Sequence, residues 1–449
     1  MLPHRRELQT YPTGARRRRL LAVVILALFI SAYEGQLAPV LPLLLDDLGM
    51  SLRLYGLLTA ASLLFGALAG FVGGSLADRF GRVRLLVPFM FLSGLACLFM
   101  ATSQSITQFA LARILLAFVE GVAVAGTAPL VRDFTPRLGR AQAYAFWSWG
   151  PVGANFFAAG VAAATLDLLG GTWQSQLYLM AAVSLAGSVV IALTLQDLAP
   201  HLRREVRFSD DSARAARAPL ARPGARHLVG HAVVWQHVIA MSSLFVLLGT
   251  MNAYGQVLVV DTFGVSVRTA SLVVVFFWAA NLVTSLAVAR WSDTVQRRSP
   301  FLLGGGVGIL LALSALLLLM GRGEAASPAA VVGVLVVLGA AMGGVFGPWM
   351  ASFSAHTEEI HPDLQGSAFG LQHLVSRLLV LASVVLAPRV AEAAGWRTWL
   401  LVALVLAGVF TVLAGWLHRA ERRLLRRPTQ ATGADVLTRT GGAGATATG

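Results

Sequence analysis

Four charged residues interrupt otherwise apolar stretches of this sequence, away from the ends of those stretches. They are Glu34, Arg113, Glu120 and Arg377. A charged side chain at the centre of a bilayer costs about 3 kcal/mol or more unless it faces a partner or a wet cavity. Charges in such places are therefore candidates for proton transfer or for binding a charged solute.

Two of these residues are glutamates that could carry protons. Glu34 lies near the middle of the first apolar stretch, and a carboxyl group removed from water can load and release a proton near neutral pH. Glu120 follows Arg113 by about two helical turns, so both should face the same way, along with Ala117. We expect Glu34, Glu120 and Arg113 to form a proton-coupling site. The alternatives are a hydrogen-bonded structural glutamate and a static ion pair.

Arg377 could bind the substrate. His373 lies four residues before it on the same predicted helix face, and Gly366, Gly370 and Ser376 make that flank small or polar. A guanidinium in a cavity binds a carboxylate or a phosphate through two hydrogen bonds. Arg377 and His373 are therefore predicted substrate-binding residues, the alternative being an arginine that reaches out to the membrane surface.

Aromatic and amide side chains at inner positions could line the same cavity, and each could equally serve helix packing. These further candidates are Tyr33, Gln36, Asn155, Asn252, Tyr254, Trp278 and Asn281.

The surrounding sequence indicates how these residues are held. The chain of 449 residues is 57% hydrophobic and 12% charged, with a mean hydropathy of +0.72, so lipid must cover much of its surface. An all-α membrane protein with twelve transmembrane helices is predicted. The predicted spans lie near 20–44, 54–76, 85–102, 107–130, 142–166, 176–195, 233–258, 268–289, 300–320, 328–352, 366–388 and 396–417.

The basic residues predict an orientation. There is no lysine, and most of the 35 arginines fall on one side of the predicted spans, which is the pattern of cytoplasmic loops. This placement argues against nucleic acid as the reason for the net charge of +14. Residues 16–19 precede an apolar stretch too long for a signal peptide. We expect a multi-pass protein of the bacterial inner membrane with both termini cytoplasmic.

An internal repeat divides the chain. Asp46, Gly49, Ser51 and Arg53 recur 215 positions later as Asp261, Gly264, Ser266 and Arg268, and the same offset relates Asp78 to Asp293 and Arg82 to Arg297. Parallel repeats are typical of transporters that bind substrate between two halves. The predicted division is a cytoplasmic arm (1–19), a six-helix bundle (20–195), a cytoplasmic linker (196–232), a second six-helix bundle (233–418) and a partly disordered tail (419–449).

The segment from Gly74 to Arg82, between the second and third spans, resembles the G-x-x-x-D-R-x-G-R loop signature of the major facilitator superfamily. A second copy from Ala289 to Arg297 lacks the glycines. The resemblance implies two pseudo-symmetric bundles and a latch that holds one face closed; the alternative is that these charges only fix topology. The implied latch residues are Gly74, Asp78, Arg79, Gly81, Arg82, Asp293 and Arg297.

The stretch from Arg113 to Gly121 is similar to the R-x-x-x-G-x-x-E signature of the anion:cation symporter branch, which implies that Arg113 and Glu120 belong to a proton relay. Gly35 stands where that branch has its substrate-binding arginine, and Ala117 replaces a glycine. Residues 150–153 resemble a fragment of an antiporter motif, but a helix kink explains them equally well.

Proton-coupled symport of a small organic anion is the predicted function, with proton-driven efflux of drugs or metabolites as the alternative. A non-transporting membrane protein is a third reading. No enzymatic activity is expected, because Glu358, Glu359 and His361 lack a metal-ligand set and Cys97 stands alone. We expect a monomer that meets a small-molecule substrate and the lipid bilayer, with no metal and no cofactor besides the proton as coupling ion.

Overall fold

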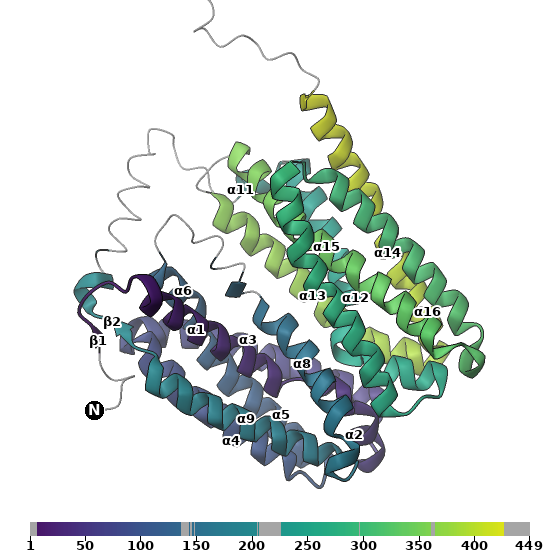
Figure 1. Cartoon of the computed structure of the whole chain (residues 1–449), viewed down its shortest axis with the longest axis horizontal. Coiled ribbons are helices and arrows are strands. Elements are labelled where there is room, and N and C mark those ends of the chain that lie inside the picture. The colour runs from purple at the N-terminus through teal and green to yellow at the C-terminus, as the bar shows by residue number, and fades with distance from the viewer. Residues whose placement is uncertain are drawn as a thin grey trace, which may run out of the picture.

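The computed structural model describes residues 7–135, 143, 146–147, 149–203, 205, 226–295, 297–360 and 364–425, and they are almost entirely helical. Two helical bundles result, one from each half of the chain. Figure 1 shows the purple and blue helices of the first bundle approaching the green and yellow helices of the second near α2 and diverging toward α11.

The first bundle contains α1 (Gly14–Glu34), α2 (Leu41–Asp47), α3 (Leu52–Phe80), α4 (Arg82–Ala101), α5 (Ile106–Val124), α6 (Thr127–Phe134), α8 (Trp149–Thr165) and α9 (Trp173–Thr194). The second contains α11 (Arg226–Val229), α12 (Ala232–Phe263), α13 (Val267–Val295), α14 (Ser299–Met320), α15 (Pro328–Ile360) and α16 (Gln365–Leu425). Short 3-10 turns, η2 (Ala38–Val40), η3 (Asp167–Leu169) and η4 (Gly323–Ala325), and the strands β1 (Glu7–Leu8) and β2 (Asp197–Leu198) complete the described elements.

The membrane-spanning helices agree with the predicted twelve. Within the described ranges, ten helical segments are long and apolar enough to cross a bilayer. One of these, in α16, consists of two helices that meet at Gly395, whose φ of 79° breaks the helical backbone. The apolar helix α8, with 17 residues, supplies the twelfth.

The first predicted span, 20–44, lies within one apolar span, Gly14–Asp47, which is divided between helices. The helix α1 begins earlier, at Gly14, and stops at Glu34, after which η2 and α2 continue across the membrane. Pro39 and Pro42 sit in the first turns of η2 and α2, where their missing N–H groups leave no helical hydrogen bond unmade. Glu34 therefore lies at a break between helices rather than inside one.

The internal repeat is visible as two copies of one turn. Gly49 and Gly264 both have left-handed φ angles, 58° and 63°, before the next helix. The hydroxyl of Ser51 accepts the Leu54 N–H at 3.2 Å, and that of Ser266 accepts the Thr269 N–H at 3.2 Å. The offset of 215 positions thus preserves both a turn and a helix cap.

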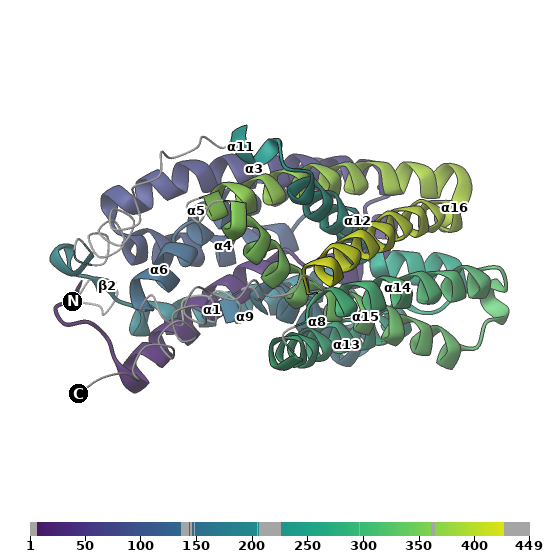
Figure 2. The same ribbon diagram turned by 90° about the horizontal axis from the view of Figure 1, so that it is seen from above.

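The two bundles join at the end of the molecule that carries few arginines, which we name the closed end. Arg53 of the first bundle pairs with Glu392 of the second at 3.6 Å, and its backbone N–H donates to the same carboxylate at 2.8 Å. Arg268 of the second bundle pairs with Asp167 of the first at 2.9 Å. The repeated arginines therefore reach across the junction in opposite directions. Figure 2 shows α3 meeting α16 where the bundles join.

At the arginine-rich end, the predicted arm 1–19 is not separate from its bundle. The strand β1 pairs in parallel with β2, and α1 already begins at Gly14. Of the predicted linker, residues 204 and 206–225 lie outside the described residues, as do residues 426–449 of the predicted tail. The helix α16 extends to Leu425, beyond the predicted end of the second bundle.

Candidate functional site

Glu34, Glu120 and Arg113 meet inside the first bundle, and we call them the charged cluster. Glu34 is fully buried at the end of α1, and the Glu120 carboxyl lies beside Gly35, close enough to interact electrostatically with Glu34. A proton on one of these carboxyl groups would let it donate a hydrogen bond to the other. Arg113 Nη1 donates to the Gly35 carbonyl at 3.2 Å, next to Glu34. The sequence periodicity correctly placed Arg113 and Glu120 on one helix face.

A hydroxyl group that the sequence analysis missed orients the cluster. Ser93 in α4 is fully buried, and its Oγ donates to Glu34 Oε1 at 3.0 Å while also contacting the Met90 carbonyl at 2.8 Å. Residues in α4 lie far from Glu34 in sequence, and a serine in an apolar helix carries no signal of its own. Ser93 leaves the second carboxylate oxygen of Glu34 for other partners.

Close packing of α3 on α5 sets the position of Glu120. A Cβ added to Gly121 would meet the Gly66 carbonyl, and one added to Gly66 would meet the Ala117 carbonyl at 3.0 Å. Glycines at these points let the two backbones touch. The side chain of Glu120, beside Gly121, is held where α1 ends.

Tyr33 and Cys97 lie next to the cluster but make no hydrogen bond to its three charged side chains. Tyr33 is fully buried and packs against Phe29 and Phe157, at ring distances of 6.2 and 5.2 Å. Cys97 is buried and its thiol points to the Leu177 carbonyl at 3.7 Å. The structure thus brings Tyr33 to the charged cluster without giving it a hydrogen bond there.

Two predicted cavity amides meet across the junction of the bundles. Asn252 in α12 donates from its side chain to Asn155 Oδ1 in α8 at 3.1 Å. Near them, the Tyr254 hydroxyl donates to the Val384 carbonyl at 2.6 Å, and its ring lies 6.2 Å from that of Tyr55 in α3. These side chains form a polar layer between the halves, on the closed-end side of the molecule.

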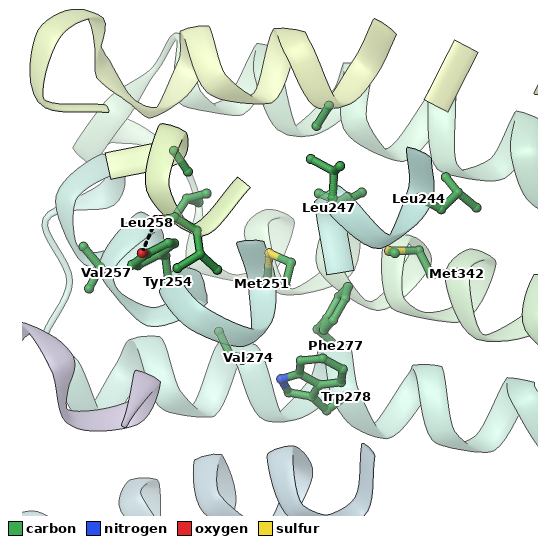
Figure 3. Close-up of a cluster of buried hydrophobic side chains, with 14 of the residues drawn as sticks. Leu244, Leu247, Met251, Tyr254, Val257, Leu258, Val274, Phe277, Trp278 and Met342 are labelled. Atoms are coloured by element: carbon green, nitrogen blue, oxygen red, sulfur yellow. Dashed lines mark hydrogen bonds between the residues drawn. The ribbon is translucent and has the colours of Figure 1, made fainter. Parts of the chain in front are cut away.

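The remaining predicted cavity residues, Asn281, Trp278 and Gln36, lie in different surroundings. Asn281 donates to the Gly339 carbonyl at 3.3 Å and so serves the packing of α13 on α15, not a cavity. Trp278 is 3% exposed and packs beside Phe277. Figure 3 shows it among the apolar side chains around Tyr254 and Met251, with the indole toward the blue ribbons of the first bundle. Gln36 is half-buried in the break after α1.

The predicted substrate anchor, Arg377, is exposed on α16, between the exposed side chains of Leu374 and Leu378. His373 is also exposed, and its Nδ1 contacts the Phe369 carbonyl of its own helix at 2.8 Å. The structure therefore does not bring either residue to the charged cluster.

The predicted latch segment is mostly helix rather than loop. The helix α3 continues to Phe80, and Gly81 alone makes the turn into α4, with a φ of 102°. Arg82 is buried and forms an ion pair with Asp133 of the same bundle, while Arg79 is exposed over the Phe80 ring. In the second copy, α13 runs to Val295 and Arg297 is exposed. Gly74 lies within α3, and the side chains of Asp78 and Asp293 lie outside the described part of the structure.

Asp197 is a further residue that the sequence analysis missed. Its Oδ2 accepts the Val83 N–H at 3.0 Å, at the start of α4, and it interacts with Arg203 and Arg82. Burial, the largest effect, raises the pKa of the Asp197 carboxyl above its usual value despite these favourable contacts. Asp197 ties strand β2 to the latch segment.

Among the side chains that the structure describes, no group of three or more His, Cys, Asp or Glu residues lies close enough to hold a metal ion. The charged cluster instead offers two carboxyls, one guanidinium and one hydroxyl. This set can hold and pass a proton.

Sequence comparison points to one family. The profile of the Major Facilitator Superfamily matches residues 20–384. The multi-drug resistance efflux pump PmrA of Streptococcus pneumoniae is 30% identical over 138 residues, 30% of this chain and 35% of PmrA. The 4-hydroxybenzoate transporter PcaK of Pseudomonas aeruginosa is 28% identical over 218 residues, 47% of this chain and 46% of PcaK. The matched segments thus cover less than half of each relative.

Solved structures match over most of their length. A D-xylose–proton symporter has a TM-score of 0.65 at 16% identity, covering 89% of this chain and 97% of the symporter. A bacterial homologue of the human lysosomal transporter Spinster, in an inward-facing and occupied conformation, has a TM-score of 0.68 at 15% identity, covering 94% and 100%. At these identities the likeness establishes the fold alone.

Proposed function

Because the chain belongs to the major facilitator superfamily, we propose that it is a proton-coupled transporter that moves a small organic anion across the bacterial inner membrane by alternating access. The observation that carries this proposal is the buried contact between Glu34 and Glu120 beside Arg113. Two carboxyls that share a proton next to one fixed positive charge can change their proton content at little cost in net charge. PcaK, a distant relative, is named for an aromatic carboxylate.

The direction of opening follows from the arginines and the closed end. The arginine-rich end would be cytoplasmic, with both termini there. The bundles join at the opposite end through Arg53–Glu392 and Arg268–Asp167, so the present conformation would be open toward the cytoplasm. In symport, the bound substrate and the proton would leave on the cytoplasmic side.

Efflux by proton antiport is a second candidate, and one observation favours it. At the break after α1, Glu34 is followed by Gly35, so no arginine stands beside Glu34 to attract an anion. The match to PmrA, named as a multi-drug efflux pump, agrees with this alternative.

Transport into proteoliposomes separates the two functions. With an imposed pH gradient, 4-hydroxybenzoate, gluconate, lactate and a cationic dye would be offered in turn. Symport predicts that an anion accumulates in wild type and that Glu34→Gln or Glu120→Gln lowers gradient-driven accumulation at least tenfold. The exposed Glu359→Gln would serve as the control. Dye extrusion with no anion flux would reject anion symport in favour of efflux.

A further inference from the structure

Arg113 has hydrogen-bonding capacity that the protein leaves unused. Its Nη1 donates to the Gly35 carbonyl, which lies at the break after α1, outside the regular hydrogen-bond ladder of the helix. Its Nε is buried and has no partner among the described residues. A guanidinium has five N–H donors, so the group is oriented by the backbone and still has donors to offer.

Arg113 also lies within electrostatic reach of the junction of the bundles. It interacts electrostatically with Glu120 in its own helix and with Tyr254 in α12 of the other bundle. The ring of Tyr254 contacts that of Tyr55, and the polar layer of Asn155 and Asn252 also joins the bundles here. The guanidinium is therefore within electrostatic reach both of Glu120 and of the surface where the two halves meet.

A second unused polar group lies on the neighbouring helix α3. In the packing of α3 on α5, Gly66 lies against Ala117 and Gly70 lies against Gly121. Each residue of α3 is therefore at the same height along the bundle as the residue of α5 that is 51 positions later. This register places Thr59 about one turn from the level of Arg113. Thr59 is 7% exposed, and its Oγ1 has no partner among the described residues. A buried polar atom without a partner is costly, which favours a ligand at this point.

From these contacts we infer that Arg113, rather than Arg377, receives the carboxylate of the transported anion. The inference rests on the proposed anion transport and deepens it. Arg377 makes no ion pair or hydrogen bond with the described residues, and apolar side chains flank it on an exposed helix face. Arg113 stands where an anion would contact both halves at once, as alternating access requires.

This position would link anion binding to protonation. With one proton on the two glutamates, the charged cluster has no net charge. A carboxylate bound to Arg113 adds one negative charge, and a second proton on the glutamates restores neutrality. Each ligand therefore strengthens the binding of the other, by the same factor in both directions. Among the described residues, Cys97 from α4 interacts with all three charged groups and Tyr254 from α12 interacts with Arg113. Tyr33 from α1 precedes Glu34 and interacts with Cys97.

The test compares Arg113→Gln and Arg113→Lys with Arg377→Gln, using 4-hydroxybenzoate, gluconate and lactate as probes. The readout is exchange of labelled anion across proteoliposomes at equal pH, which needs substrate binding but no net proton movement. We expect the anion concentration for half-maximal exchange to rise at least tenfold in Arg113→Gln and by an intermediate factor in Arg113→Lys. Arg377→Gln should stay within twofold of wild type. Glu34→Gln should keep exchange while losing gradient-driven accumulation.

The possible outcomes distinguish a failure of this inference from a failure of the proposed function. Normal exchange in Arg113→Gln, or its loss in Arg377→Gln alone, would overturn the inference and leave anion transport standing. If wild type exchanges none of the three anions and extrudes a cationic dye, the proposed function fails, and the inference fails with it. Should Arg113→Gln not fold, Arg113→Lys decides, because it keeps the charge and removes the two-point contact with a carboxylate.

Discussion

At the scale of single residues, sequence periodicity predicted much of the charged cluster. Arg113 and Glu120 share a face of α5 because they are two turns apart, and the structure shows both turned toward the end of α1. The partner hydroxyl of Ser93 could not be predicted, since the contact depends on how α4 packs on α1. The roles of these residues in proton transfer stay predictions.

Asp197 gives a prediction on pH. Because burial raises the pKa of Asp197 in the folded protein, the folded state holds this proton more tightly than the unfolded chain does. Stability from this group is therefore fully present below the unfolded value of about 3.8 and is lost as the pH rises through the folded pKa. The unfolding temperature of wild type relative to Asp197→Asn should increase as the pH falls from about 7 to 4.

Thermal unfolding of the purified protein, followed by tryptophan fluorescence, measures this difference. Glu205→Gln changes an exposed carboxylate near the same strand and serves as the control. A difference between wild type and Asp197→Asn that stays constant over this pH range would contradict the prediction.

At the scale of elements, the repeat predicted the turns and caps but not the contacts across the closed end. Ser51 and Ser266 cap helices because local sequence suffices for a cap. The pairing of Arg53 with Glu392 joins residues 339 positions apart and depends on the packing of two bundles. The break after Glu34 was missed because η2 and α2 are themselves apolar, although Pro39 and Pro42 were signals that could have shown it.

The two ion pairs at the closed end should bias the conformational equilibrium modestly. Arg53 and Arg268 are 55% and 53% exposed, and exposed pairs each contribute about 0.2–1 kcal/mol. Replacing both arginines by glutamine should therefore increase the population open at this end by roughly two- to thirtyfold. The measurement is the labelling rate of Ala163→Cys, which is buried at the junction, by a reagent applied from the arginine-poor side.

Two controls define the result. Arg322→Gln removes an exposed arginine at the same end and should leave the labelling rate unchanged. The exchanged pair Arg53→Glu with Glu392→Arg should bring the labelling rate of Ala163→Cys part of the way back from that of the double glutamine variant to that of wild type. Equal labelling of wild type and the double glutamine variant would show that these pairs do not hold the closed end.

At the scale of the whole molecule, the long apolar segments, the internal repeat and the resemblance of Gly74–Arg82 to a family signature together predicted the fold. Lipid requires long apolar helices and leaves few alternatives. Orientation is the part that still depends on an argument from arginine placement. A cysteine at Leu168, which is 82% exposed in η3, should react with an impermeant thiol reagent applied to intact cells. One at Glu359, exposed at the end of α15, should react only after permeabilisation. The reverse pattern would invert the proposed topology.

The break in α1 has a mechanical consequence. Gly35, whose carbonyl holds Arg113, is connected by only a few residues to Pro39, whose carbonyl accepts a hydrogen bond from Ser271 of the other bundle at 3.4 Å. This short strut is covalent, so it cannot slip as packed side chains can. A displacement of α13 that pulled on Pro39 would therefore be carried through residues 35–39 to Gly35, and from its carbonyl to the guanidinium of Arg113.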